Sequence, residues 1–286
     1  MLRFPIICGG GIGDSFMLLG RVPISLLGTL GLRFNIFYED ASQGHPSKKQ
    51  LVPFFNEIKY ARYMERNPSA YERVIWQKMC SVSARIRKVW PPPLRYDKDK
   101  SVLPKPGERN KRILIQSHLD GTHGWKGASA KMWKIENWVD FIRSLHQLGC
   151  EVGIMEWDVP ARQKIMQECP YVVDQSSGLD LKHLCGLMGT YDCLISVDSW
   201  SKYAAEWCRI RQIIILPDLR KGYATGFSEI AADQVVRWWF HGLSINARVK
   251  ILGVDNVNGK WEYAWSSIND LSVEKLIMET KLLLKL

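Results

Sequence analysis

The second half of the sequence alternates short apolar runs with stretches of helical periodicity, and this alternation restricts the fold most. Residues 113–115, 193–197 and 212–216 are apolar runs of strand length. Between them, the apolar residues of 138–148 recur at helical spacing, and 201–208 is a second helical stretch. Strands that alternate with helices are typical of a parallel sheet covered by helices. We therefore expect an α/β protein with a doubly wound sheet.

Further elements complete this second unit. We expect strands at 151–155 and 171–173, a helix whose first turn contains Pro160, and another helix at 179–188. After them the pattern changes.

The end of the chain differs from this alternation. Asn258-Gly259 separates two strand-like segments, 249–254 and 260–264, which predicts a β-hairpin. Ser272 is placed to cap a final helix, 273–286.

The first half repeats the alternation. We expect strands at 3–8 and 33–38, separated by a helix at 15–30. Helices are expected around 48–65 and 69–89. Two Rossmann-like doubly wound domains that face a cleft are therefore the predicted architecture.

A proline-rich segment separates the two halves. Residues 91–112 hold five of the thirteen prolines and many charges, so they cannot continue a helix or a central strand. We expect an N-terminal domain, a linker, a second Rossmann-like domain and a C-terminal helix at 1–92, 93–111, 112–270 and 271–286.

The positive charge is concentrated in the first half. Residues 1–110 hold 18 Lys and Arg against 9 Asp and Glu, whereas residues 111–286 hold 21 against 20. The excess indicates either a solvated basic surface or a face for an anionic partner, such as a phosphorylated glycan, nucleic acid or a membrane surface. We favour the partner, because the asymmetry coincides with the predicted domain boundary.

The cysteines and the hydropathy indicate a cytoplasmic protein. The seven cysteines form no CxxC pair, so we expect reduced thiols and no structural zinc. No apolar run reaches the ~20 residues of a transmembrane helix, and the N-terminus lacks the pattern of a cleaved signal peptide.

A glycine cluster, 9–13, follows the first predicted strand and precedes a helix. Backbone N–H groups at such a helix start can hold an anion or a sugar. The GxGxxG fingerprint of dinucleotide-binding proteins fails, because Asp14 stands where its third glycine should be. A carboxylate facing a pyrophosphate is repulsive, so a dehydrogenase is disfavoured.

In the second half, polar residues follow the strands at their carboxyl ends, where open α/β sheets bind ligands. These residues are Gln116-Ser117, Glu156, Asp198-Ser199 and Asp218. The start of a helix at Ser201 could hold a diphosphate, or Asp198 or Ser201 could simply cap that helix.

Three short segments, in order, resemble a known enzyme family. Gly-Gly-Ile-Gly-Asp-Ser (10–15) resembles the G-x-I-G-D motif of heptosyltransferase-like glycosyltransferases, the ADP-heptose:lipopolysaccharide family with the GT-B fold. Lys-Met-Trp (131–133) followed by Glu136 is similar to their K-x-W-p-x-e segment. Ile195–Ser199 with 203–205 resembles their v-D-S/T-G-x-x-H-x-A-A segment.

The resemblance implies site residues. It implies that Asp14 is the general base that takes a proton from the acceptor hydroxyl. It implies donor contacts from Lys131, Glu156, Asp198, Ser199, Ser201 and Tyr203. With the basic first half, it suggests acceptor contacts from Gly10, Gly11, Gly13, Ser15, Arg85 and Lys88, although Arg85 and Lys88 could equally be the solvated face of a helix.

Two positions depart from the family pattern. Trp200 replaces its glycine and Tyr203 its histidine, so the donor sugar should not be carried over. We expect no cofactor and no metal, since a nucleoside-diphosphate sugar is the substrate and the resemblance implies transfer without an essential metal.

The predicted function is therefore inverting transfer of a sugar to a hydroxyl of an anionic acceptor, such as a lipopolysaccharide or another surface glycan, by a protein that could lie peripherally at a membrane. Two alternatives stay open: a DNA glycosyltransferase acting on a hydroxymethylated base, and a non-catalytic module that binds nucleic acid or nucleotide sugars.

Overall fold

A computed structural model describes most of the chain. It covers residues 3–9, 11–39, 47–86, 90, 110–117, 132–156, 158–176, 180–218, 220, 231–240, 243, 245 and 247–286. The side chains at 47, 83–86, 238 and 239 are excepted. The predicted linker lies almost wholly outside these ranges.

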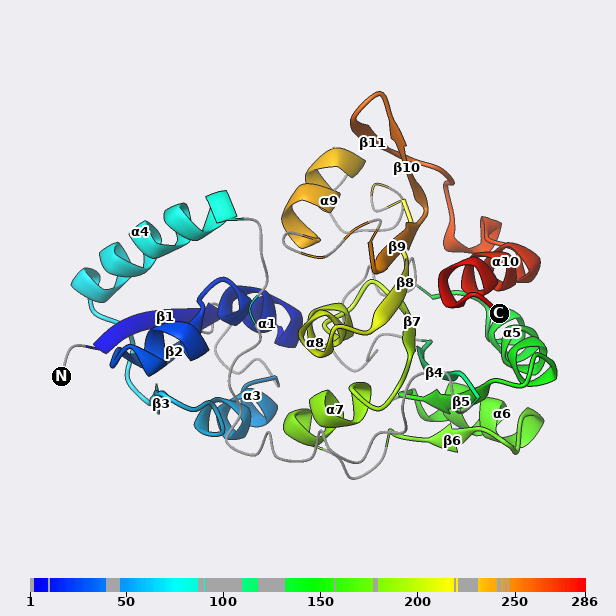
Figure 1. Cartoon of the computed structure of the whole chain (residues 1–286), viewed down its shortest axis with the longest axis horizontal. Helices are drawn as coiled ribbons and strands as arrows, with labels where there is room; N and C mark the ends of the chain where they lie inside the picture. The colour runs from blue at the N-terminus through cyan, green and yellow to red at the C-terminus, as the bar shows by residue number, and fades with distance from the viewer. Residues whose placement is uncertain are drawn as a thin grey trace.

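The first half forms a parallel sheet with the order β1-β2-β3 among the described strands (Figure 1). Its strands are β1 (Arg3–Gly9), β2 (Arg33–Glu39) and β3 (Ala61–Met64). The β1–β2 register runs from Arg3 opposite Arg33 to Gly9 opposite Glu39, so both strands end at the same edge. The helices are α1 (Ile12–Gly20), α2 (Ile24–Thr29), α3 (Ser47–Asn56) and α4 (Ala70–Ile86).

Two predictions for this half were wrong in detail. The helix expected at 15–30 is two helices, because Pro23 has no N–H to donate and its ring blocks a continuous helix. The helix expected at 48–65 ends at Asn56, and Ala61–Met64 forms β3 beside β2. Tyr60 has a φ of 69° and begins the change of direction into that strand.

The second half forms a larger parallel sheet with the order β6-β5-β4-β7-β8-β9. Its strands are β4 (Arg112–Gln116), β5 (Glu151–Ile154), β6 (Val173–Asp174), β7 (Cys193–Val197), β8 (Arg211–Ile215) and β9 (Val249–Leu252). The chain winds outward from β4 to β6, returns to β7, and then winds the other way. The order therefore reverses between β4 and β7, which is where doubly wound sheets open a crevice for ligands.

The helices of the second half agree with the predicted pattern except for α9 (Ala232–Trp239), which was not predicted from the sequence. They are α5 (Ile135–Gln147), α6 (Val159–Glu168), α7 (Leu181–Met188), α8 (Ser201–Cys208), α9 (Ala232–Trp239) and α10 (Val273–Leu284), with a short 3-10 turn, η4 (Ile268–Asp270). Ser272 caps α10 as predicted, because its hydroxyl accepts a hydrogen bond from the Lys275 N–H at 3.2 Å.

The predicted hairpin is present, but its first strand begins at Val254, where the expected strand 249–254 ends. Val249–Leu252 is not part of it and forms β9, parallel to β8. Only β10 (Val254–Val257) pairs with β11 (Lys260–Tyr263) across the Asn258-Gly259 turn. Gly253, with a φ of 103°, makes the bend that separates β9 from β10.

The two halves meet through helices. α1 lies against α8, and α3 lies against α7 (Figure 1). Phe16 of α1 is fully buried and stacks on Trp207 of α8 with a centroid separation of 4.6 Å. Lys182 of α7 donates to Glu57, just after α3, at 3.1 Å. One apolar core therefore continues from the first sheet into the second.

The seven cysteines are free thiols, as expected, and five of them are buried. Burial raises the pKa of Cys8 and of Cys193 far above the ordinary value, which keeps both protonated. None of the described helices is long and apolar enough to cross a membrane.

Candidate functional site

The turn that follows β1 and the turn that follows β7 lie against each other. A Cβ built on Gly13 would lie 3.5 Å from the Cα of Trp200, which is ordinary van der Waals contact. Trp200 is the N-cap of α8 and directly follows Asp198-Ser199. The fold thus brings the glycine segment and the Asp-Ser segment, 185 residues apart in the sequence, into one place.

Asp14 lies at the exposed mouth of the glycine turn. It is the third residue of α1, and its Oδ2 accepts a hydrogen bond from the Gly11 N–H at 3.0 Å. This bond is half of a capping box, so it orients the carboxylate and satisfies a free N–H at the helix start. An exposed carboxylate fixed in this way can receive a proton from a bound hydroxyl.

The other predicted acceptor residues are only partly described. Ser15 is fully buried, and its hydroxyl donates to the carbonyl of Gly9 at 3.5 Å, so it supports the turn from inside. Gly11 and Gly13 line the turn. Gly10 and Lys88 lie outside the described residues, as does the side chain of Arg85.

On the donor side, three buried side chains join the ends of β4 and β7. The Ser199 hydroxyl donates to Gln116 Oε1 at 2.6 Å and lies 2.9 Å from the Ser201 hydroxyl. The Ser201 N–H donates to Ser199 Oγ at 3.3 Å. These bonds cross the point where the strand order reverses. They hold the start of α8, with its N-terminal N–H groups, beside the predicted crevice.

Asp198 belongs to a buried ion pair. Lys202 Nζ lies 2.5 Å from Asp198 Oδ1, and both side chains are almost wholly buried. The lysine ammonium also lies about 5 Å from the ring centroids of Tyr203 and Phe240. The pair satisfies both charges within the fold and fixes the carboxylate at the end of β7.

Tyr203 is buried behind this pair. Burial raises the pKa of its hydroxyl far above the ordinary value, and the negative charges of Asp198 and Asp14 raise it further. Asp14, on the first half, is therefore within electrostatic reach of α8.

Glu156 is fully buried at the end of β5. Its carboxylate accepts from the Ser117 hydroxyl through Oε2 and from the Asp158 N–H through Oε1, the latter at 2.7 Å. The Glu156 N–H donates to Ser176 Oγ at 2.6 Å. In this state Glu156 ties together the ends of β4 and β5. Its predicted contact with the donor nucleoside stays a prediction, as do the roles of Lys131, which lies outside the described residues, and of the other site residues.

Trp200, which replaces the family's glycine, is half-buried at the junction of the halves. Its ring meets Phe16 edge to face, with centroids 5.6 Å apart. Phe16 also stacks on Phe54 at 5.0 Å. The indole is thus held by the aromatic contact that joins α1 to α8.

Sequence reasoning missed two cations in this region, Lys202 and Arg220. The i,i+4 spacing of Asp198 and Lys202 was a usable signal for the first. Arg220 forms an ion pair with Asp218, a residue that the sequence already placed at a strand end.

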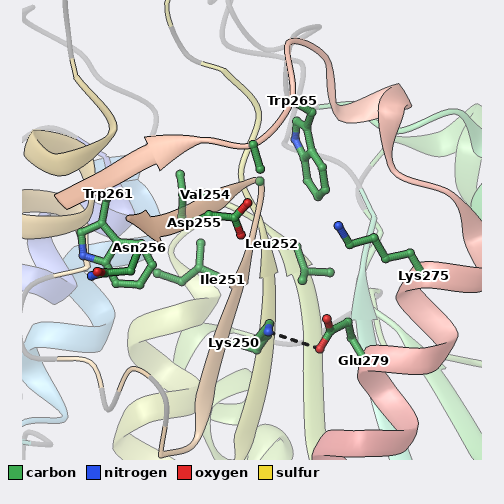
Figure 2. A pocket seen from close by; sticks show the side chains of 12 residues that line it. Lys250, Ile251, Leu252, Val254, Asp255, Asn256, Trp261, Trp265, Lys275 and Glu279 are labelled. Atoms are coloured by element: carbon green, nitrogen blue, oxygen red, sulfur yellow. Dashed lines mark ion pairs between the residues drawn. The ribbon is translucent and has the colours of Figure 1, made fainter. Parts of the chain in front are cut away.

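A surface pocket lies elsewhere, between β9, β10 and α10 (Figure 2). Trp261, Trp265 and Lys275 belong to its lining. Lys250 and Glu279 also line it, and Lys250 Nζ lies 3.4 Å from Glu279 Oε2. Its described lining contains none of the predicted site residues. Within the described part of the chain, no group of three or more His, Cys, Asp and Glu could hold a metal ion.

No protein-family model matches the sequence, and no curated protein matches it. Solved structures do match over the whole chain. A heptosyltransferase of E. coli, WaaC, with bound ADP is 9% identical, with a TM-score of 0.60 over 98% of this chain and 99% of that one. A glycosyl transferase of family 9 from Veillonella parvula DSM 2008 is 10% identical, with a TM-score of 0.56 over 99% and 97%.

A third match is the E. coli ADP-heptose lps heptosyltransferase II, which is 12% identical, with a TM-score of 0.52 over 99% of both chains. All three are named as heptosyltransferases or glycosyl transferases, and none is named for DNA or for binding alone, so they give no support to the alternatives of a DNA glycosyltransferase or a non-catalytic module. At these identities the likeness is one of fold. The chain has the GT-B fold of the heptosyltransferase-like glycosyltransferases, as its three motifs predicted.

Proposed function

We propose that this protein is a glycosyltransferase that moves a sugar from a nucleoside-diphosphate sugar to a hydroxyl group of a glycan acceptor, with inversion at the anomeric carbon. One observation carries the proposal: the exposed carboxylate of Asp14 lies on the turn that packs against the start of α8. A proton acceptor and a helix start suited to a diphosphate are thus held side by side in a GT-B fold.

The reaction follows from this arrangement. The acceptor hydroxyl oxygen attacks C1 of the donor sugar, and Asp14 takes the proton of that hydroxyl. The bond between C1 and the phosphate oxygen breaks, and the nucleoside diphosphate leaves with the electron pair. The N–H groups at the start of α8, with Ser199, Ser201 and the Lys131 that the family motif supplies, stabilise its charge. This chemistry uses only protein groups.

The two halves divide the substrates between them. The acceptor lies on residues 1–92, whose glycine turn has few side chains to obstruct a sugar and whose basic charge suits an anionic glycan. The donor lies on residues 112–270, where Gln116 and Ser199 meet at the reversal of strand order. The linker is 93–111, and the helix at the end of the chain closes the second half.

The first donor to test is an ADP-sugar, because WaaC was solved with ADP and with ADP-2-deoxy-2-fluoro heptose. The first acceptor to test is a lipopolysaccharide core, because another neighbour is an lps heptosyltransferase. An acceptor of this kind would place the protein at the cytoplasmic face of a membrane without crossing it.

The test is a panel of ADP-, UDP-, GDP- and dTDP-activated sugars offered with lipopolysaccharide acceptors, followed by mass spectrometry of the acceptor and by NMR of the new linkage. The proposal predicts one added sugar of inverted configuration and one released nucleotide. If no donor binds and no acceptor gains mass, the proposal is wrong.

A further inference from the structure

An arginine at the end of β8 forms an ion pair that the proposed reaction leaves unused. Arg220 Nε lies 2.9 Å from Asp218 Oδ1, and its Nη2 lies 2.8 Å from Oδ2. The Arg220 N–H also donates to Asp218 Oδ1 at 3.0 Å. The carboxylate is 2% exposed, whereas the arginine side chain is 48% exposed. A buried carboxylate thus binds one edge of the guanidinium of a half-exposed side chain.

A second contact holds the same guanidinium from the side. The Arg220 Cζ lies 4.8 Å from the centroid of the Tyr263 ring on β11. The hairpin that carries Tyr263 is itself fixed to the end of β8. Trp265 Nε1 donates to the Leu216 carbonyl at 3.1 Å, and a Cβ on Gly253 would clash with that carbonyl. The orientation of Arg220 is therefore set by Asp218 and by Tyr263 on β11.

The sheet order places the segment that leads to Arg220 at the same edge of the sheet as the proposed transfer point. β7 and β8 are neighbours in register, with Val197 opposite Ile215, so Asp198 and Leu216 leave the sheet at the same edge. Neighbouring strands are about 4.8 Å apart. The strand that leads to Arg220 thus lies next to β7, the strand that leads to α8, on the side away from β4.

A guanidinium held by a carboxylate on one edge keeps its other donors for a second planar or tetrahedral oxyanion. Among the described residues, Nη1 of Arg220 carries no hydrogen bond. The bond to Asp218 raises the pKa of the guanidinium, so its charge is permanent. An arginine that served only solubility would need neither a buried carboxylate partner nor an aromatic ring beside its guanidinium, and Arg220 has both.

We propose that Arg220, oriented by Asp218 and Tyr263, is an anion subsite that binds a phosphate group of a substrate. This inference rests on the proposed function, which offers two sources of that phosphate: the diphosphate of the donor and a phosphorylated acceptor glycan. Both sources present a phosphate group, and the experiment distinguishes the donor from the acceptor.

The experiment compares the unmodified protein with Arg220→Gln, Arg220→Lys and the control Arg143→Gln. Arg143 is 46% exposed and also pairs with carboxylates, Asp140 and Glu168, but it lies on α5. Each protein is titrated with ADP, UDP and GDP, and its KM is measured for acceptors with and without phosphate groups. Melting temperatures establish that all four proteins fold.

Arg220→Gln is expected to change either the nucleotide affinity or the acceptor KM about tenfold, because a hydrogen bond to a charged group contributes about 1.5 kcal/mol. Loss of nucleotide affinity assigns the subsite to the donor, and a higher KM restricted to phosphorylated acceptors assigns it to the acceptor. Arg220→Lys should change the same quantity less, since lysine keeps the positive charge but lacks the paired N–H donors of the guanidinium. Arg143→Gln should lose nothing.

The inference is overturned if folded Arg220→Gln matches the unmodified protein in both nucleotide affinity and acceptor KM. Failure of the proposed function looks different, since the unmodified protein itself would then bind no nucleoside diphosphate and transfer no sugar.

Discussion

The carboxyl ends of the two sheets are built in opposite ways. At the first sheet a glycine turn presents one exposed carboxylate, Asp14, held by a single bond from Gly11. At the second sheet the polar groups are buried and bonded to one another, as the Ser199–Gln116 bond and the Asp198–Lys202 pair show. The proposed function accounts for this difference, because a group that accepts a proton has to be accessible, whereas groups that stabilise charge act best when they are fixed in advance.

This comparison predicts that substitutions at the two sheet edges affect different properties of the protein. Substitutions at the first edge should slow transfer and leave the fold intact. Substitutions at the second edge should lower stability or nucleotide affinity. Four variants test that division, in order of expected effect.

Asp14→Asn should reduce sugar transfer by about 10²–10⁴-fold, because an amide cannot accept the proton of the acceptor hydroxyl. Its melting temperature and its affinity for nucleoside diphosphate should match those of the unmodified protein. Steady-state transfer assays and calorimetric titration measure both. If Asp14→Asn transfers sugar at the normal rate, Asp14 is not the general base.

Lys202→Met should lower the free energy of unfolding by about 3–5 kcal/mol, because it removes the ammonium from a buried carboxylate. Urea denaturation measures the change. The double variant Asp198→Asn with Lys202→Met removes both charges and is the control. It should recover much of the loss, and a single variant as stable as the parent would show that the pair is not buried in solution.

Glu156→Gln should lower the free energy of unfolding by about 2 kcal/mol, because the neutral amide weakens the bonds from Ser117 and from the Asp158 N–H. Glu274→Gln, on the exposed face of α10, is the matched control and should change it by less than about 0.5 kcal/mol. Equal effects in the two variants would argue against a structural role for Glu156.

Ser199→Ala should weaken nucleoside diphosphate binding about tenfold, which corresponds to one hydrogen bond to a charged group of about 1.4 kcal/mol. Calorimetry with the variant gives the affinity directly. Ser144→Ala, at a half-buried position of α5, serves as the control. Unchanged affinity in Ser199→Ala would remove this serine from the donor site.

The fold was predictable where the period of the apolar residues was clear. Elements β7, α8 and β8 lie within one residue of their expected bounds, because strand and helix periods differ sharply there. β3 escaped detection because four residues with little alternation follow a helical pattern. β9 was merged with the hairpin because only Gly253 separates them, and its positive φ is not visible in the sequence.

The site was predictable as motifs and unpredictable as contacts. Asp14 and Asp198 stood out because each follows a strand beside a helix start. The pairing of Arg220 with Tyr263 joins residues 43 positions apart, and it depends on the hairpin folding back over the end of β8. No local pattern contains that information, since cation–ring contacts are set by tertiary packing.

The most direct test of the account is a crystal structure with a bound nucleoside diphosphate. The account predicts that the diphosphate lies at the start of α8, within hydrogen-bonding distance of Ser199, with Asp14 facing it across the junction of the halves. Phosphates bound instead on the turn at Gly11–Gly13 would contradict it, because the carboxylate of Asp14 would then lie at the nucleotide and not at the acceptor.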